Sequence, residues 1–150
     1  RFFNVYGGNQ DDRRANPPLT AYIIKCLHEN RVPGLQSDGE QKRDYIYVSD
    51  IADALIAVAI SKNTNGEVYN AGSGIGTSFI KMVETIAEVI DGTEIKKVSW
   101  PKDRAFVETG DYISDLAKIK KDTGWNPKLD LLTGIEETFQ YYKKNKNKYW

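Results

Sequence analysis

The sequence has very few of the residues that build disulfides, metal centres or histidine-based active sites. Its 150 residues include one cysteine, Cys26, and one histidine, His28. A single cysteine excludes an intrachain disulfide and favours a reducing compartment. His28 and Cys26 point to different faces of a predicted helix and supply too few ligands for a zinc site. A Ser-His-Asp mechanism would depend on His28 alone, so we expect neither a metal site nor hydrolytic chemistry of that kind.

The chain also lacks an excess of charge of either sign and any long apolar run. Lys and Arg together number 21, as do Asp and Glu, so the net charge is zero. Without a global positive field, nucleic-acid binding is disfavoured, and an anion site must be built locally from a few residues. No apolar run approaches the roughly 20 residues that span a bilayer, and no signal peptide is visible. We expect a cytoplasmic protein that binds neither nucleic acid nor a membrane.

Strand-like and helix-like segments alternate along the chain, which predicts an α/β fold. The short apolar segments bounded by turn residues are predicted strands, at residues 2–6, 44–48, 67–72 and 94–100. Segments with apolar residues three and four apart are predicted helices, at residues 19–30, 51–60, 78–90, 115–123 and from 133 onward. The second of these is apolar on most sides and is expected to be buried.

Capping residues mark the expected starts of three helices. Ser49 or Asp50 precedes the helix at 51–60, and Ser114 precedes the short helix at 115–123. Thr133 is expected to begin the last helix, because Glu136 follows three residues later as in a capping box. Gly124 is expected to end the short helix.

A glycine cluster, "NAGSGIGTS" at residues 70–78, lies between a predicted strand and a predicted helix. This is the setting of a dinucleotide-binding turn, but Gly72, Gly74 and Gly76 have the spacing Gly-x-Gly-x-Gly instead of the fingerprint Gly-x-Gly-x-x-Gly. The alternative is a turn that needs positive φ angles and is followed by a Thr or Ser cap. Spacing favours the turn without excluding NAD.

Two further polar residues are candidates for a binding site. Arg43 precedes a buried strand, where its guanidinium could form bidentate bonds to a diphosphate or pair with Asp44 or Asp50 at the surface. Asn4 interrupts the apolar strand "FFNVY" and must satisfy either a neighbouring backbone group or a ligand. The mixed-charge stretch 101–113 is either a solvated loop or a lid over a charged ligand.

Five stretches together resemble one family, the NAD(P)-dependent epimerases and dehydratases of nucleoside-diphosphate sugars in the extended short-chain dehydrogenase/reductase group. In chain order they are "RFFNVYG", "GEQKRDYIYVSDIADAL", "GEVYNAGSGIGTS", "ETGDYISDLAKIKKDTGWNPK" and "GIEETFQYY". The resemblance implies that residues 1–150 form a single unit. That unit is the C-terminal portion of a Rossmann-like doubly wound sheet plus the small substrate-binding subdomain, with the N-terminal cofactor-binding portion absent. The glycine cluster is then not the cofactor loop.

The resemblance also implies which residues bind substrate. Asn4 contacts the substrate near its diphosphate, Arg43 binds that diphosphate, and Asn70 lies near the site. The stretch that packs on the nucleobase is expected at Leu35 and Gln36.

The sequence departs from the family pattern at three places. Gly8 replaces a frequent proline after "VYG". Gln36 and Ser37 stand where an aromatic residue and glycine are often found. Glu108 occupies the position of a diphosphate-binding arginine, where its charge would repel the diphosphate, and Arg104 is expected to substitute for that arginine.

The chemistry of the family is hydride transfer to NAD(P), with a tyrosine general base and a lysine four residues later. Tyr142 and Lys146 have this spacing only at the end of the chain, which we interpret as coincidence. The chain is therefore expected to be the nucleotide-sugar-binding part of an enzyme that transiently oxidises sugar C4, and to be inactive by itself. NAD or NADP belongs to the parent enzyme and is not expected to bind residues 1–150 tightly.

Two alternatives remain open at this point. The chain could be a stand-alone, non-catalytic module that binds nucleotide sugars or assembles with other proteins, or a dehydrogenase-type fold that uses the glycines of 72–76 for NAD. The expected partners are a nucleoside-diphosphate sugar and a second copy of the chain, since a sheet that begins at residues 2–6 presents an unpaired edge for a homodimer or other self-association.

Overall fold

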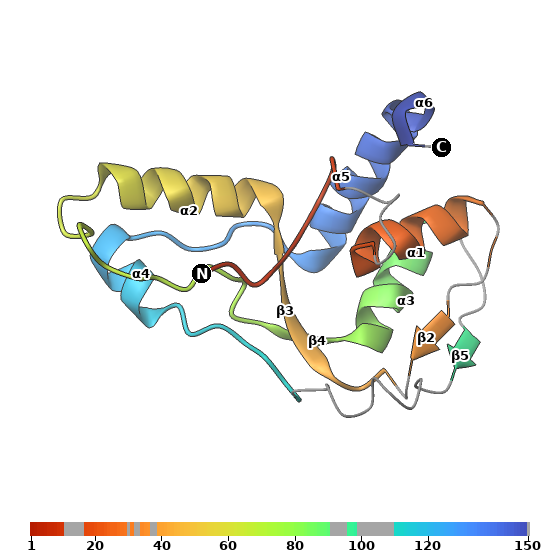
Figure 1. The fold of residues 1–150 in the computed structure, drawn as a ribbon, viewed down its shortest axis with the longest axis horizontal. Helices are drawn as coiled ribbons and strands as arrows, with labels where there is room; N and C mark the ends of the chain where they lie inside the picture. The colour runs from red at the N-terminus through yellow and green to blue at the C-terminus, as the bar shows by residue number, and fades with distance from the viewer. Residues whose placement is uncertain are drawn as a thin grey trace.

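The α/β class predicted from the sequence is confirmed by a computed structural model (Figure 1), which describes residues 1–10, 17–29, 31, 34–36, 39–90, 96–98 and 110–149. The strands are β1 (Asn4–Tyr6), β2 (Gly34–Gln36), β3 (Lys42–Tyr47), β4 (Gly76–Ser78) and β5 (Lys96–Val98). The helices are α1 (Leu19–His28), α2 (Val48–Ile60), α3 (Phe79–Ile90), α4 (Ala117–Thr123), α5 (Leu131–Lys144) and α6 (Lys146–Tyr149).

The strand β3 is the centre of the main sheet, whose order is β1-β3-β4. β1 runs parallel to the second half of β3, with Asn4 opposite Tyr45. β4 runs antiparallel to its first half, with Thr77 opposite Arg43. β2 and β5 form a separate parallel pair. Long β3 therefore brings the segment around residue 4 and the segment around residue 77 to the same strand.

Two hydrophobic clusters lie on opposite faces of β3, because successive side chains of a strand point to opposite sides. Tyr45 and Tyr47 pack into a cluster with helices α1, α3 and α5. Ile46 packs into a second cluster with α2 and α4. In Figure 1, β3 passes between these two groups of helices.

The same alternation assigns the polar residues to faces. Tyr6 of β1 belongs to the first cluster, so Asn4, two residues earlier, lies on that face as well. Arg43 shares the face of Tyr45 for the same reason. Asp44 lies on the opposite face, with Ile46.

The predicted strand at 67–72 is reduced to a single bridge in the structure, between Ala71 and Phe2. The amide of Ala71 donates to the carbonyl of Arg1 at 2.9 Å, and the amide of Phe3 donates to the carbonyl of Ala71 at 3.3 Å. These bonds occupy part of the edge that was expected to be unpaired. The prediction missed β4, which forms where a turn and a helix cap were expected.

The predicted caps of three helices were wrong. α2 begins at Val48 without a side-chain cap, and Asp50 instead accepts hydrogen bonds from the amides of Lys128 and Leu129, both at 3.0 Å. The cap of α5 is Asp130, whose carboxylate accepts from the amide of Thr133 at 2.8 Å.

The third wrong cap is Ser114, which binds Asp44 instead of capping a helix, and α4 follows with Leu116 at its N-cap position. The predicted end of this helix is confirmed. Gly124 adopts a left-handed φ of 74° at the C-cap, which glycine tolerates without strain. Tertiary partners of Asp50 and Ser114 therefore displaced two of the predicted caps, whereas the start of α5 and the end of α4 follow local geometry.

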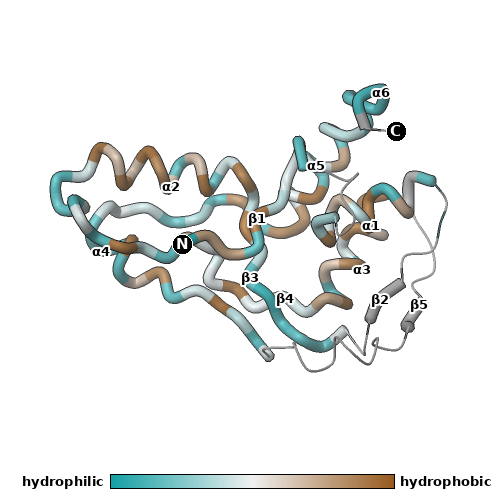
Figure 2. Tube along the Cα trace, in the orientation of Figure 1, coloured by the Kyte–Doolittle hydropathy of each residue, from teal (hydrophilic) through white to brown (hydrophobic). Residues whose placement is uncertain are grey.

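The helix α2 is not buried on most sides, contrary to the sequence-based expectation. Hydrophobic residues recur along it (Figure 2), but Leu55, Ile56 and Ile60 are 54%, 59% and 78% exposed. Only one side of the helix, with Ile51 and Ala54, packs on the sheet. Within the described ranges, no helix is long and apolar enough to cross a membrane.

Candidate functional site

Asn4 and Arg43, which were predicted separately from two motifs, line one cleft. The cleft has a volume of about 580 Å³ and is lined by Phe2, Phe3, Asn4, Arg43 and Tyr112. The rings of Phe3 and Tyr112 stack with their centroids 4.9 Å apart and their planes 23° apart. The pairing of β1 with β3 therefore places an amide, a guanidinium and an aromatic wall around one open space.

Arg43 is held in place by contacts that leave its charge at the cleft. Its Nη1 donates to the carbonyl of Gly110 at 2.6 Å and to that of Lys42 at 2.9 Å. The guanidinium carbon lies 5.5 Å from the centre of the Phe79 ring, within range of a cation–π contact. A half-buried arginine fixed in this way has lost part of its rotamer freedom before any ligand binds, which favours binding of an anion.

The carboxylates of Asp44 and Asp50, the two ion-pair partners considered for Arg43, have other partners. Asp44 is fully buried and lies on the opposite face of β3. The Asp50 carboxylate binds backbone amides of the segment before α5. The surface ion pair with these residues is therefore not what holds Arg43.

Asn4 binds the backbone and lines two cavities. Its Nδ2 donates to the carbonyl of Asp44 at 3.2 Å, and its side chain is exposed. Besides the cleft with Arg43, Asn4 lines a second cavity of about 180 Å³ with Gln10, Tyr45 and Phe79 among its other residues. The backbone partner of Asn4 considered from the sequence is therefore present, and its contact with a ligand stays a prediction.

The phenol of Tyr45 is the least satisfied polar group near the second cavity. Its hydroxyl is buried and has no hydrogen-bond partner among the described residues. Burial raises the pKa of Tyr45 well above its usual value, with the charge of Arg43 acting in the opposite direction. Tyr45 is therefore a protonated potential donor at neutral pH.

The glycine cluster is built around an internal carboxylate. Asp44 Oδ1 accepts from the amide of Ser73 at 2.6 Å and from its hydroxyl at 2.7 Å. Asp44 Oδ2 accepts from the amides of Gly74 and Ser114, both at 3.0 Å, and from the Ser114 hydroxyl. A Cβ on Gly72 would lie 2.5 Å from Asp44 Oδ2. The loop amides that would cradle a pyrophosphate thus already bind Asp44, and this loop does not fit NAD.

The other predicted site residues are not brought to this cleft by the described part of the chain. Asn70 is half-buried and is not among the residues that line it. Leu35 and Gln36 lie on β2, paired with Lys97 and Val98 of β5. Arg104, like the rest of 101–109, lies outside the described residues.

Sequence reasoning missed the aromatic part of the cleft. Phe2, Phe3 and Tyr112 line it, and Tyr45 and Phe79 line the neighbouring cavity. The alternation of "RDYIY" could have indicated Tyr45, because it must share the face of Arg43. Tyr112 carried no comparable signal, since its place depends on a hydrogen-bonded bridge to Arg43 from 69 residues further along the chain.

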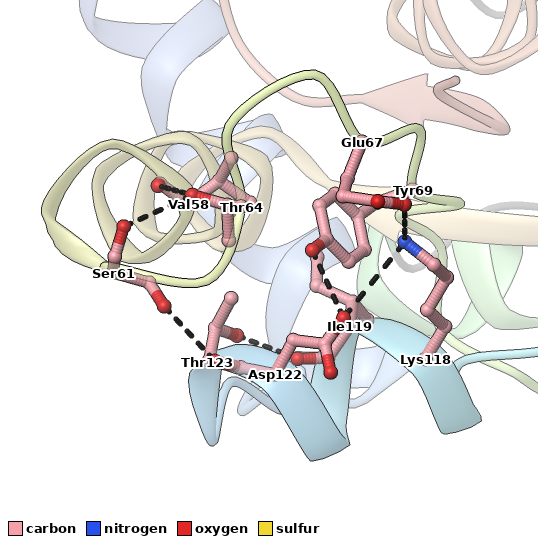
Figure 3. Close-up of polar contacts among 9 residues, drawn as sticks. All are labelled: Val58, Ser61, Thr64, Glu67, Tyr69, Lys118, Ile119, Asp122 and Thr123. Atoms are coloured by element: carbon pink, nitrogen blue, oxygen red, sulfur yellow. Dashed lines mark hydrogen bonds and ion pairs between the residues drawn. The ribbon is translucent and has the colours of Figure 1, made fainter.

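A tyrosine and a lysine do meet elsewhere, beside α4, but not as a base and its activator. Lys118 Nζ lies 3.9 Å from the centre of the Tyr69 ring and forms ion pairs with Glu67 at 2.7 Å and with Asp122 at 3.8 Å (Figure 3). The Tyr69 hydroxyl donates to Asp122 Oδ2 at 3.0 Å. Burial, and then this bond to Asp122, raise the pKa of Tyr69. A general base needs the opposite shift, so the cluster serves to join α4 to the loop after α2.

Tyr142 and Lys146, the pair with the spacing of a base and its lysine, are also in a structural setting. Tyr142 is buried in the first cluster, and its hydroxyl donates to the carbonyl of Gln10 at 3.3 Å. Among the described residues there is also no group of three or more His, Cys, Asp or Glu side chains that could hold a metal ion.

The fold is shared by solved sugar-nucleotide enzymes with the Rossmann fold of the extended short-chain dehydrogenases. The UDP-glucose 4-epimerase of Thermotoga maritima, solved with UDP-glucose, matches with a TM-score of 0.86 at 28% identity, over 97% of this chain and 45% of that one. The dTDP-glucose 4,6-dehydratase of Bacillus anthracis, solved with NAD, matches with a TM-score of 0.83 at 28% identity, over 98% and 44%. The class of protein is therefore that of NAD-dependent sugar epimerases and dehydratases.

The sequence model of the GDP-mannose 4,6 dehydratase family matches residues 1–138, and the chain belongs to this family. The dTDP-glucose 4,6-dehydratase of Escherichia coli is 35% identical over 83% of this chain and 36% of its own length. The mouse dTDP-D-glucose 4,6-dehydratase is 29% identical over 97% of the chain and 40% of its own length. The family resemblance drawn from the five motifs is confirmed, and the chain spans less than half the length of these relatives.

Proposed function

We propose that this chain is the nucleotide-sugar-binding part of an NAD-dependent epimerase or dehydratase. The observation that carries the proposal is the meeting of Asn4 and Arg43 in one cleft. In this assignment, Arg43 binds the diphosphate and Asn4 donates to or accepts from the same ligand. The relatives act on nucleoside-diphosphate sugars, as their names state, which supports this class of ligand.

The chemistry of the cleft suits such a ligand. A guanidinium presents planar donors that match a diphosphate, and one already fixed by Gly110 and Phe79 pays little entropy on binding. The stacked rings of Phe3 and Tyr112 offer an apolar wall for a sugar or base. Asn70, Leu35, Gln36 and Arg104 are proposed as further contacts on the family resemblance alone.

We also propose that residues 1–150 do not turn over substrate by themselves. The pKa of Tyr69, which contacts Lys118, is raised by burial and by its hydrogen bond to Asp122, whereas a general base needs a lowered pKa. The amides of the glycine loop at 72–76 already bind Asp44. NAD or NADP supplies hydride transfer in the whole enzyme, and the chain's own residues bind and orient the sugar nucleotide. A mixture of chain, NAD and UDP-glucose or dTDP-glucose should therefore show no 4-epimerised or 4-keto product, and detectable product would contradict this part.

Calorimetric titration with UDP-glucose and dTDP-glucose tests the binding function. The unmodified chain should bind at least one of them saturably, whereas free glucose should not bind. Arg43→Ala should weaken binding by about 10- to 100-fold, the range expected when a charged hydrogen bond of roughly 1.5–3 kcal/mol is removed. Lys42→Ala is the matched control, because it removes the same charge from the neighbouring exposed position. Equal affinity of the two variants, or no binding by the unmodified chain, would refute the proposal.

Self-association with a second copy is a further part of this proposal. The expected unpaired edge is partly occupied by Ala71, so the better surface is the exposed apolar side of α2 with Phe2. Phe2 and Leu55 line one shallow cavity, which makes the surface continuous. Ile56→Lys with Ile60→Lys should lower the sedimentation-derived mass toward a monomer. An unmodified chain that is monomeric at high concentration would contradict this part alone.

A further inference from the structure

We propose that Asp44 is a positioning residue that holds the segment Gly110–Ser114, which forms one wall of the cleft that contains Arg43. This inference rests on the proposed function, because it concerns how the nucleotide-sugar site is held. Asp44 does not touch the cleft, since its side chain lies on the opposite face of β3 and is fully buried. It acts instead through the segment Gly110–Ser114.

The Asp44 carboxylate joins two segments that are far apart in the sequence. Five donors bind its two oxygens: the amides and hydroxyls of Ser73 and Ser114, and the amide of Gly74. All five donors are neutral amides and hydroxyls, so these five dipoles stabilise the buried carboxylate. Gly72 leaves the space for this arrangement, because a side chain there would collide with the carboxylate.

The segment bound at Ser114 runs on along β3 to the cleft. The amide of Asp44 donates to the carbonyl of Tyr112 at 3.1 Å, and the amide of Tyr112 donates to the carbonyl of Lys42 at 3.2 Å. At the far end, Arg43 donates to the carbonyl of Gly110. Arg43 and Asp44 thus fasten the two ends of the same five residues, from opposite faces of the strand.

Removal of the hydrogen bonds of Asp44 should therefore weaken ligand binding through the segment Gly110–Ser114. Tyr112 forms the aromatic wall with Phe3, and Gly110 fixes the guanidinium of Arg43. If Ser114 no longer binds Asp44, the positions of Tyr112 and Gly110 are less constrained. Every side chain that lines the cleft nevertheless remains present. The expected consequence is weaker binding without any change in the groups that contact the ligand.

The test compares Asp44→Asn with Asp50→Asn. Both residues are buried aspartates that bind backbone amides of a distant segment, but Asp50 holds the segment before α5 instead of Gly110–Ser114. Both variants should lower the free energy of unfolding. Only Asp44→Asn should weaken binding of UDP-glucose or dTDP-glucose, by about tenfold, whereas Asp50→Asn should change it less than about twofold.

A second readout needs no ligand. Amide hydrogen exchange of Tyr112 and Ser114 in the ligand-free chain should be at least about tenfold faster in Asp44→Asn than in Asp50→Asn, at conditions of equal global stability. Equal exchange in the two variants would overturn the positioning role. Failure of the unmodified chain to bind any nucleotide sugar would instead refute the proposed function. The exchange rates of Tyr112 and Ser114 would then still test whether Asp44 positions this segment.

A milder variant covers the case in which Asp44→Asn does not fold. Ser114→Ala removes one of the five donors and keeps the carboxylate, so its effects should have the same direction and be about threefold. Ser61→Ala is the matched control, because its hydroxyl binds the carbonyl of Asp122, away from the cleft. Binding and exchange that are the same in these two serine variants would contradict the proposal.

Discussion

Replacing Gly134 with alanine should destabilise the protein, although glycine-to-alanine changes inside helices normally do the opposite. Gly134 lies in the first turns of α5 and is buried against Tyr6 of β1. A Cβ there would collide with the Tyr6 hydroxyl and lie 2.9 Å from its Cζ. Helix propensity would add about 1 kcal/mol of stability. Overpacking of a closed core typically costs about 1–3 kcal/mol.

The second effect should win, because Tyr6 has little room to move away. It is 2% exposed, belongs to the first cluster, and its hydroxyl lies 3.4 Å from the carbonyl of Leu131. The two effects together leave a loss of at most about 2 kcal/mol, and we expect Gly134→Ala to lower the free energy of unfolding by about 1 kcal/mol. Urea denaturation followed by tryptophan fluorescence and by circular dichroism measures this quantity.

A double-mutant cycle with Tyr6→Phe tests the stated cause. Tyr6→Phe removes the oxygen that meets the new Cβ, so Gly134→Ala should be less destabilising in that background, with a coupling of about 1 kcal/mol. The ring carbons still crowd the site, so relief is partial. An alanine variant as stable as the unmodified chain, or additive effects of the two changes, would refute the packing argument.

Three further outcomes follow from the structure. Stability should be constant between pH 8 and about pH 10 and fall above it, because burial raises the pKa of Tyr45 and raises that of Tyr47 to about 12, so the unfolded chain releases these protons first. Denaturation midpoints at pH 8 to 11.5 measure this, and Tyr45→Phe should reduce the fall and add about 1 kcal/mol of stability at neutral pH. A flat profile to pH 11.5 would be inconsistent with these pKa shifts. Asp130→Ala should lower the thermal midpoint by removing the cap of α5. In the unmodified chain the contribution of this cap to stability should be lost as pH falls below about 4, because bonds to Thr133 lower the pKa of Asp130. Equal midpoints of the two chains at pH 7 would argue against the cap. Gly72→Ala should lower the free energy of unfolding by about 2 kcal/mol or more, because the new Cβ collides with Asp44. Gly66→Ala, with no neighbour within 4 Å, should show only the cost of its positive φ, about 1 kcal/mol. Similar losses of stability in both variants would exclude the collision.

The sequence predicted the parts of the site that depend on short-range pattern. The alternation of "DYIYV" and the apolar "FFNVY" indicated two strands, and their family resemblance indicated Arg43 and Asn4 as neighbours of one ligand. The expected burial of "FFNVY" was wrong, since only Tyr6 of that segment is buried. The structure places Arg43 and Asn4 in one cleft because β1 and β3 pair in parallel register. Helical periodicity likewise located the buried face of α3, with Val83 and Ile86 in the core.

The parts that failed depend on which donors and acceptors meet across the fold. Ser114 and Asp50 both have the composition of helix caps, but each found a partner in a segment about 70–80 residues away, and that competition is not encoded locally. The glycine cluster had the composition of a phosphate loop and surrounds Asp44 instead. The predicted burial of α2 was wrong for a related reason, since a helix that is hydrophobic on most sides does not indicate which of them are covered by the rest of the fold.

The alternation of β3 gives the site an unusual sensitivity to chain length. Arg43 and Asp44 are adjacent in sequence and serve opposite faces, one the cleft and the other the interior. Inserting one residue between Asp44 and Tyr45 would exchange the faces of Arg43 and Asp44 if Tyr45–Tyr47 kept their pairing with β1. A carboxylate would then face the proposed diphosphate, and a guanidinium would enter the pocket of amides built for an anion. Both electrostatic matches would become repulsions, so homologous chains should tolerate many substitutions in this stretch but few changes in its length.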